Sequence, residues 1–250
     1  MTNKYRYFVA NWKMFGDVKS INSLNKVIKI SKSRKFNKAK IIYCPPYTLL
    51  NTFVTRLKKT KINVGAQNCH QSRSTGAFTG YINSKMIKNI GCNYIIIGHS
   101  ENRIDGETDS LINKKIKAAL KNNLKILFCI GENAKEKRTK KTKKILTNQL
   151  KRGLKKIKNI KNIIIAYEPA WSIGTGMIPN NNELFDNIML IKKFLRKNFK
   201  CKNSKVLYGG SVNPNNIKNL SVIDQIDGFL VGGASRNSNK FIDIIKKTFN

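Results

Sequence analysis

The chain has 250 residues, 40% of them hydrophobic, and it carries 49 Lys or Arg against 13 Asp or Glu, a formal net charge of +36. This length allows a large hydrophobic core, and we expect a single domain over residues 1–250. Residues 1–14 lack the apolar segment of a signal peptide, and no apolar run is long enough to cross a bilayer. These features exclude secreted and membrane-spanning classes and predict a soluble, cytoplasmic protein.

Short apolar runs alternate with longer amphipathic segments along the whole chain. Val18, Ile21, Leu24 and Ile28 have helical spacing in the first such segment, and only the seventh, near 214–220, looks short. Runs that are apolar throughout are typical of parallel strands covered on both faces. The predicted strands are residues 7–11, 40–44, 62–66, 94–98, 125–129, 163–167, 205–208 and 228–231.

Eight strand–helix units in a chain of this length predict an α/β fold, a closed eight-stranded parallel (β/α)8 barrel. An open doubly wound sheet is the alternative. That fold usually has G-x-G-x-x-G after its first strand, whereas NWKMFGD follows the first strand here. We therefore expect the barrel.

The segment 133–162 holds much of the positive charge, with 13 Lys or Arg and one acid, Glu136. Its apolar residues recur at helical spacing, which predicts an amphipathic helix with a solvated basic face. The alternative is a surface for nucleic acid, but no helix-turn-helix, RNP or zinc-finger pattern accompanies the charge. We expect at most weak, non-specific nucleic-acid binding. The apolar residues in question are Leu146, Leu150, Leu154, Ile157 and Ile160.

Cysteine and histidine usage argues against a disulfide framework and a zinc site. The chain has five cysteines without a C-x-x-C pair and only two histidines, His70 and His99. We expect free thiols and no metal or other cofactor. Cys129 lies on an apolar strand without an evident histidine partner, so we interpret it as a core residue beside the site and not as a nucleophile.

Polar residues collect where the predicted strands end, which is where barrels of this type place their active sites. Asn11 and Lys13 follow the first strand, His99 and Glu101 the fourth, and Glu168 the sixth. Each of these residues taken singly also has an ordinary structural explanation. A carboxylate that ends a buried strand, however, needs a partner or a task. Their joint occurrence predicts an active site at this end of the barrel.

Long motifs at these strand ends carry a family resemblance. In chain order they are ANWKM (10–14), GAQN (65–68), TGAFTG (75–80), IIGHSEN (96–102), CIGE (129–132), AYEPAWSIGTG (166–176), YGGSV (208–212) and DGFLVGGAS (227–235). Together they resemble the triosephosphate isomerase family over the whole chain. The resemblance implies a TIM barrel and a homodimer that interconverts dihydroxyacetone phosphate and D-glyceraldehyde 3-phosphate in glycolysis and gluconeogenesis, without a metal.

The resemblance also implies residue roles. Glu168 would be the base that moves a proton between adjacent carbons, and a neutral His99 would donate to the enediolate oxygen, a well-known feature of this family. Asn11 and Lys13 would flank the same oxygens. Glu101 would hold Lys13 in place, although a surface acid is an alternative that the sequence leaves open.

The substrate phosphate would be bound by main-chain N–H groups near the glycine-rich turns. The resemblance assigns this role to Gly174, Ser211, Gly232 and Gly233. Residues 169–176 would form a lid that excludes water, with Trp171 as its apolar anchor.

The chain departs from the family pattern at two positions that the resemblance places near a subunit interface. Asn102 replaces an Arg, Tyr81 replaces a Glu, and the loop from Arg103 to Glu107 looks one residue short. A pair of opposite charges is thus lost together, which avoids an orphan charge. Another phosphate-binding barrel, such as a ribulose-phosphate epimerase, is the rival enzyme, but it needs metal-ligand histidines on several strands.

Overall fold

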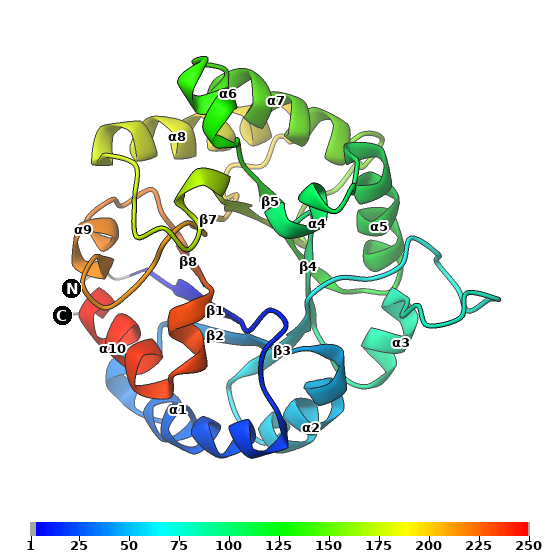
Figure 1. Cartoon of the computed structure of the whole chain (residues 1–250), viewed down its shortest axis with the longest axis vertical. Coiled ribbons are helices and arrows are strands. Elements are labelled where there is room, and N and C mark those ends of the chain that lie inside the picture. Colours follow the sequence, from blue (N-terminus) through cyan, green and yellow to red (C-terminus); the bar gives the residue numbers. More distant parts are fainter. Residues whose placement is uncertain (1–3, 250) are drawn as a thin grey trace.

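The computed structural model describes residues 4–249, which form a closed barrel of eight parallel strands. Each strand pairs with its neighbours in chain order, and β1 closes the barrel against β8 (Figure 1). The predicted barrel and its strands are confirmed, with ends that differ by at most one residue. The strands are β1 (Arg6–Asn11), β2 (Ala39–Cys44), β3 (Asn63–Ala66), β4 (Tyr94–Ile97), β5 (Lys125–Ile130), β6 (Ile163–Tyr167), β7 (Val206–Tyr208) and β8 (Gly228–Val231).

Helices form the outer ring of the barrel (Figure 1). The short seventh helical segment that the sequence predicts is α9. The α-helices are α1 (Leu24–Ser31), α2 (Tyr47–Leu57), α3 (Ser84–Asn89), α4 (Ser100–Ile104), α5 (Asp109–Lys121), α6 (Ala134–Arg138), α7 (Thr142–Gly153), α8 (Asn181–Phe199), α9 (Ile217–Ser221) and α10 (Ser238–Phe249). Short 3-10 turns are η1 (Val18–Ser23), η2 (Arg34–Phe36), η3 (Ala170–Ser172) and η4 (Gly233–Arg236).

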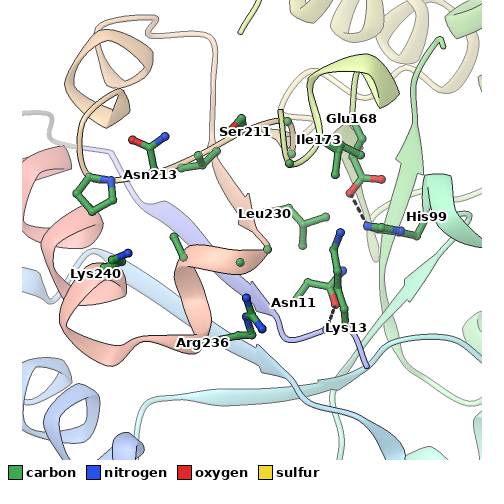
Figure 2. Close-up of a pocket in the computed structure, with 18 of the residues that line it drawn as sticks. Asn11, Lys13, His99, Glu168, Ile173, Ser211, Asn213, Leu230, Arg236 and Lys240 are labelled. Carbon is green, nitrogen blue, oxygen red and sulfur yellow. Dashed lines mark hydrogen bonds and ion pairs between the residues drawn. The ribbon is translucent and has the colours of Figure 1, made fainter. Parts of the chain in front are cut away.

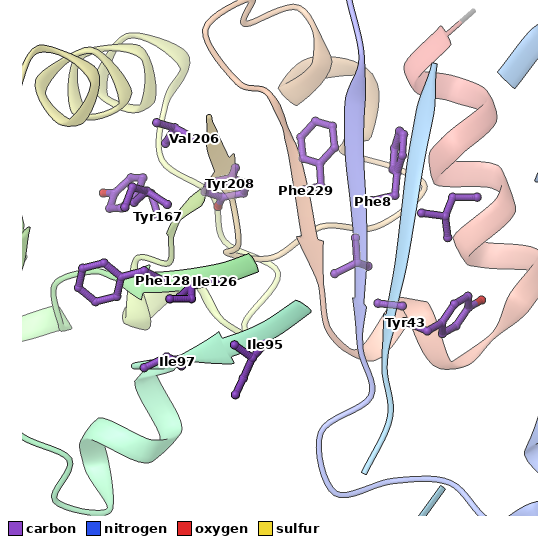
Figure 3. Packing of buried hydrophobic residues seen from close by; sticks show 14 of the residues in the cluster. Phe8, Tyr43, Ile95, Ile97, Ile126, Phe128, Tyr167, Val206, Tyr208 and Phe229 are labelled. Atoms are coloured by element: carbon purple, nitrogen blue, oxygen red, sulfur yellow. The ribbon is translucent and has the colours of Figure 1, made fainter. Parts of the chain in front are cut away.

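Both faces of the strands are buried, which explains their continuously apolar sequences. Along β5, Ile126 and Phe128 pack outward against the helices, whereas Leu127 and Cys129 fill the barrel interior. Figure 3 shows the outward layer, in which Phe8 and Phe229 pack side by side on neighbouring strands. This period-two division into two cores fixes which residues can reach the open end of the barrel.

Segment 133–162 is not one amphipathic helix, so that prediction was wrong in extent. Helix α6 ends before Lys140 and α7 ends at Gly153, and both Lys140 and Lys156 adopt left-handed backbone conformations that interrupt a helix. The apolar pattern continues because Leu154, Ile157 and Ile160 are buried by the turn that leads into β6. The basic face is solvated, as expected.

The cysteines are unpaired, as the sequence predicts. Cys44, Cys69, Cys92 and Cys129 are buried, and Cys201 is partly exposed.

Among the helices described between residues 4 and 249, none combines the length and the hydrophobicity that a membrane crossing requires.

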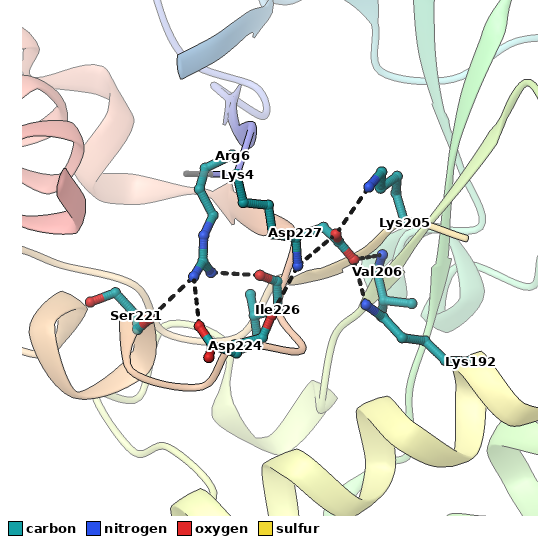
Figure 4. Close-up of polar contacts among 9 residues, drawn as sticks. All are labelled: Lys4, Arg6, Lys192, Lys205, Val206, Ser221, Asp224, Ile226 and Asp227. Atoms are coloured by element: carbon teal, nitrogen blue, oxygen red, sulfur yellow. Dashed lines mark hydrogen bonds and ion pairs between the residues drawn. The ribbon is translucent and has the colours of Figure 1, made fainter. Parts of the chain in front are cut away.

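A buried carboxylate lies at the amino-terminal end of the barrel, opposite the strand ends that carry the predicted site. Asp227 is 1% exposed and lies 2.9 Å from Lys4 Nζ, 2.8 Å from Lys192 Nζ and 3.4 Å from Lys205 Nζ (Figure 4). It also accepts a hydrogen bond from the Val206 N–H at 3.0 Å. Burial alone would raise its pKa, but Lys192, the Val206 N–H and Lys4 together lower it.

We predict that Asp227→Asn lowers the free energy of unfolding by about 3 kcal/mol, because it leaves clustered lysines without their shared carboxylate. The control is Asp243→Asn, which removes an exposed partner of Lys247 and should cost less than about 1 kcal/mol. Since the folded-state pKa of Asp227 is lowered, its contribution is present above the unfolded pKa and is lost as pH falls through the folded value. Urea unfolding of both variants across pH measures this, and equal stabilities would contradict it.

Candidate active site

A cavity of about 580 Å³ opens at the carboxyl ends of the strands (Figure 2). It brings together most of the residues that the sequence analysis selected, from strands far apart in the chain. Asn11, Lys13, His99, Glu168, Gly174, Ser211, Gly232 and Gly233 all line it. Glu101 and Cys129 do not line the cavity, but each contacts or approaches a residue that does.

Glu168 is the carboxylate of the cavity. It follows β6, is 1% exposed, and its main-chain N–H donates to the Ile130 carbonyl at 2.8 Å. Neither carboxylate oxygen has a hydrogen-bond partner among the described residues. Burial raises the pKa of Glu168, and its neighbours His99, the Cys129 thiol and the Ser100 N–H offset this only in part. Such a carboxylate is a stronger base than one in water.

Two glycines allow Glu168 to lie where it does. A Cβ on Gly131 would stand 1.8 Å from the main-chain oxygen of Glu168, and one on Gly209 would stand 2.7 Å from its Cγ. A larger residue at Gly131 would displace the backbone of Glu168, and one at Gly209 would displace its side chain. Both glycines lie in motifs that carry the family resemblance, CIGE and YGGSV, but nothing in the sequence connects them with Glu168.

His99 precedes α4 and points its ring toward Glu168. Its Nδ1 accepts a hydrogen bond from the Glu101 main-chain N–H at 3.3 Å, so Nδ1 carries no proton in this arrangement. The proton of a neutral imidazole then lies on Nε2, which is 3.5 Å from Glu168 Oε1 (Figure 2). The backbone therefore favours the tautomer that can donate into the cavity.

Lys13 is held by contacts to its backbone and to its side-chain ammonium group. Its backbone is left-handed, with φ 55°, which is uncommon for a residue other than glycine. Its N–H donates to Asn11 Oδ1 at 3.0 Å, and its carbonyl accepts from Gln67 Nε2 at 2.8 Å. The Nζ atom lies 2.5 Å from Glu101 Oε1. Glu101 thus contacts the side chain of Lys13, as the resemblance implies. Gln67, which the sequence shows only within the motif GAQN (65–68), binds the Lys13 backbone.

A buried acid, Glu132, contacts the lid segment 169–176. It lies in the motif CIGE (129–132), which gave it no role of its own. Glu132 accepts hydrogen bonds from Trp171 Nε1 at 2.9 Å and from the Tyr167 hydroxyl at 3.2 Å. Burial raises the pKa of Glu132, while the Trp171 bond favours its charged form. Trp171, expected as the apolar anchor of the lid, thus has a polar contact as well, because its indole N–H donates to a buried acceptor. Lys137 Nζ also lies over the indole ring, 3.4 Å from its centroid.

Ser172 links the lid to the glycine-rich turn after β7. Its Oγ accepts a hydrogen bond from the Ser211 main-chain N–H at 3.2 Å and contacts the Tyr208 hydroxyl at 3.0 Å. The glycines of the lid, Gly174 and Gly176, both have positive φ, at 74° and 80°. Nothing in the sequence singled out Ser172, since a serine in a loop carries no pattern of its own.

Within residues 4–249, no group of three or more His, Cys, Asp or Glu side chains is arranged to hold a metal ion. The cavity instead offers a basic carboxylate, an imidazole N–H donor and an ammonium group around one space. This combination suits removal of a proton beside a carbonyl and stabilisation of the resulting oxyanion.

Comparisons with known proteins agree with this geometry. The sequence model of the family "Triosephosphate isomerase" matches residues 6–248. The chain is 39% identical to triosephosphate isomerase of Dictyoglomus thermophilum over 247 residues, covering 96% of this chain and 98% of that protein. It is also 39% identical to the enzyme of Aquifex aeolicus over 249 residues, with the same coverage. The crystal structure of triosephosphate isomerase from Bartonella henselae superposes with a TM-score of 0.88 at 32% identity, covering 97% of this chain and 98% of that one.

We predict that the carboxyl group of Glu168 titrates above the ordinary Glu value of about 4.3, because burial disfavours its charged form. A 13C NMR titration of glutamate carboxyls measures this, and the Glu168→Gln variant identifies the resonance by its absence. A value at or below about 4.3 would contradict the prediction.

Proposed function

The chain belongs to the triosephosphate isomerase family, and we propose that Glu168, His99 and Lys13 carry its interconversion of dihydroxyacetone phosphate and D-glyceraldehyde 3-phosphate. The observation that carries these roles is the environment of Glu168, a buried carboxylate without a hydrogen-bond partner among the described residues, beside His99 at the wall of the cavity. The reaction belongs to glycolysis and gluconeogenesis. A cytoplasmic location is also part of the proposal.

The first step is proton removal. Glu168 takes a proton from the carbon beside the carbonyl, and the C–H electron pair moves to form the enediolate, which places negative charge on the carbonyl oxygen. The two oxygens of the carboxylate can reach adjacent carbons, so Glu168 returns the proton to the neighbouring carbon. General base catalysis of this kind contributes roughly 10²–10⁴-fold.

Stabilisation of the oxyanion is the second requirement. His99 donates from Nε2, and Lys13 supplies a fixed positive charge held by Glu101 and Gln67. Asn11 lines the same part of the cavity and already accepts from the Lys13 N–H. These groups need little rearrangement when charge develops, because each is already held by a neighbour.

The phosphate of the substrate is assigned to the glycine-rich turns. Gly174, Ser211, Gly232 and Gly233 line the cavity, where main-chain N–H groups can approach an anion closely. The lid excludes water while the enediolate exists, which protects it from losing phosphate. The Glu132–Trp171 and Ser172–Ser211 bonds support this role, because they tie the lid to both sides of the cavity.

A homodimer is also part of the proposal. The loop 69–83 projects from the barrel between β3 and α3 (Figure 1). It exposes aromatic surface, since Phe78 and Tyr81 are 48% and 65% exposed, although both rings pack on His70. Met14 and Phe15, beside Lys13, are exposed as well. A second copy that covers these two surfaces would bury apolar area and brace the Lys13 loop.

The relatives reported above are all triosephosphate isomerases, and nothing in the described structure supports the alternative of a nucleic-acid-binding protein. Binding of nucleic acid through the basic surface would be weak, non-specific and steeply dependent on salt.

We predict that Glu168→Asp lowers kcat roughly 10²-fold with little change in KM, since a misplacement of about 1 Å affects the transition state more than binding. A coupled assay with each triose phosphate measures both directions. Glu136→Asp makes the same chemical change on α6, outside the cavity, and should keep full activity. Wild-type turnover by Glu168→Asp would remove Glu168 from its role.

We predict that Phe78→Asp produces a monomer with reduced activity, because a charge on the projecting loop would be buried without a partner at the interface. The control is Val222→Asp, which places the same charge at an exposed site beyond α9. Sedimentation velocity across a dilution series, with activity measured on the same samples, tests this. A fully active monomer of the wild-type chain would refute the dimer proposal.

A further inference from the structure

Arg236, the last residue of η4, lies at the mouth of the cavity and has no role in the reaction as described so far. It lines the cavity together with Lys240 at the start of α10, beside the Gly232–Gly233 turn (Figure 2). A Cβ built on Gly233 would stand 4.0 Å from Arg236 Nη2, and one built on Gly232 would stand 3.5 Å from Lys13 Cε. Arg236 and Lys13 thus flank the Gly232–Gly233 turn, which is assigned to the substrate phosphate.

The guanidinium group of Arg236 is oriented by an aromatic ring. Its Cζ lies 3.9 Å from the centroid of the Phe15 ring, which belongs to the loop that follows β1 and carries Lys13. Stacking of this kind restricts the planar group and leaves its N–H donors directed sideways, toward the solvent and the cavity. Phe15 therefore holds Arg236 at the cavity mouth without consuming its hydrogen-bond donors.

Arg236 also lacks a neutralising partner. No carboxylate of the described residues forms an ion pair with Arg236 or Lys240, whereas Lys13 is paired with Glu101. The charged groups that line the cavity are thus Lys13, which pairs with Glu101, the carboxylate of Glu168, and Arg236 and Lys240, for which the described residues show no ion pair. A phosphate dianion that enters this space meets two positive charges that no ion pair with a described acid offsets.

We propose that Arg236, held by Phe15, is a phosphate-binding residue of this active site, and that Lys240 adds to the attraction at the cavity mouth. The inference rests on the proposed function, since it assumes that the Gly232–Gly233 turn receives the substrate phosphate. Main-chain N–H groups would bind one side of the anion, and the guanidinium would bind the side that faces the opening. Such a planar donor suits two phosphate oxygens at once.

The physical consequence is stronger binding of the ground state and the transition state alike. The phosphate group does not change during the reaction, so its contacts lower KM without raising kcat. An anion that carries phosphate chemistry but no reactive carbon should use the same contacts. Inorganic phosphate is therefore a direct probe of Arg236 that does not depend on turnover.

The test compares Arg236→Leu, Arg236→Lys and Phe15→Leu with the wild-type chain at low ionic strength. Binding of inorganic phosphate is measured by 31P NMR, and KM and kcat by the coupled isomerase assay. We expect Arg236→Leu to weaken phosphate binding and to raise KM about tenfold, with kcat within about twofold, since one charge-assisted contact is lost. Arg236→Lys keeps the charge but loses the planar donor and the stacking, and Phe15→Leu loses the orientation, so each should show about a threefold effect.

The control is Lys158→Leu, which removes one positive charge beside β6 at the opposite end of the barrel. It should leave phosphate binding and KM within about twofold of wild type, because its charge is far from the anion and screened. An equal loss in Lys158→Leu and Arg236→Leu would show that only the overall charge matters and would overturn the inference. Unchanged phosphate binding by Arg236→Leu would overturn it as well.

Failure of the proposed function gives a different result. If the wild-type chain did not isomerise triose phosphates but Arg236→Leu still lost phosphate binding, the catalytic roles would be wrong and the phosphate site would stand. If the wild-type chain were active and Arg236→Leu bound phosphate normally, the catalytic roles would stand and Arg236 would have no part in binding.

Discussion

Burial of the Glu168 carboxylate is the constraint on which the rest of the site depends. A charged group that is out of water and has no hydrogen-bond partner among the described residues is unfavourable, and a fold tolerates it only when the surroundings leave it no other position. Here the end of β6 and the close approach of Gly131 fix the backbone, and the close approach of Gly209 limits the side chain. The same burial that opposes folding raises the basicity of the carboxylate. Stability is thus exchanged for reactivity at one residue.

The other groups of the cavity are held in position by contacts with neighbouring residues. A main-chain N–H favours one tautomer of His99, Asn11 and Gln67 bind the left-handed backbone of Lys13, and Glu101 pairs with its Nζ. Glu132 does the same for the lid through the indole of Trp171. Each restraint lowers the reorganisation needed when charge develops on the substrate, which is how a rigid barrel supports catalysis from its loops.

The few acids of this strongly basic chain occupy specific positions. Asp227 binds three lysines at the amino-terminal end of the barrel, Glu101 pairs with Lys13, and Glu132 binds Trp171 of the lid. Most lysines of segment 133–162, in contrast, lie on the outer surface and contact solvent. The positive field is therefore general, but it is uncompensated at the cavity mouth, where Arg236 and Lys240 have no acidic partner among the described residues. An anionic substrate would be attracted by both.

The sequence by itself determined the eight strands, the closed barrel and the polar strand-end residues that line the cavity. Strands buried on both faces are continuous apolar runs, and polar residues that interrupt them at their ends, such as Asn11, His99 and Glu168, are visible without coordinates. Helical periodicity gave a wrong prediction at Leu154, Ile157 and Ile160. These residues are buried but lie beyond the end of α7, because a turn can bury apolar residues at the same spacing as a helix.

Only the tertiary structure decided which residues of distant segments meet. Gln67 braces Lys13, Glu132 accepts from Trp171, and Phe15 orients Arg236 across contacts that no local pattern encodes. These partners are paired by the closure of the barrel, which brings loops from different strands to one opening. Local sequence sets the conformation of a segment through backbone and burial preferences, whereas the polar contacts of a side chain depend on neighbours that arrive only when the chain has folded.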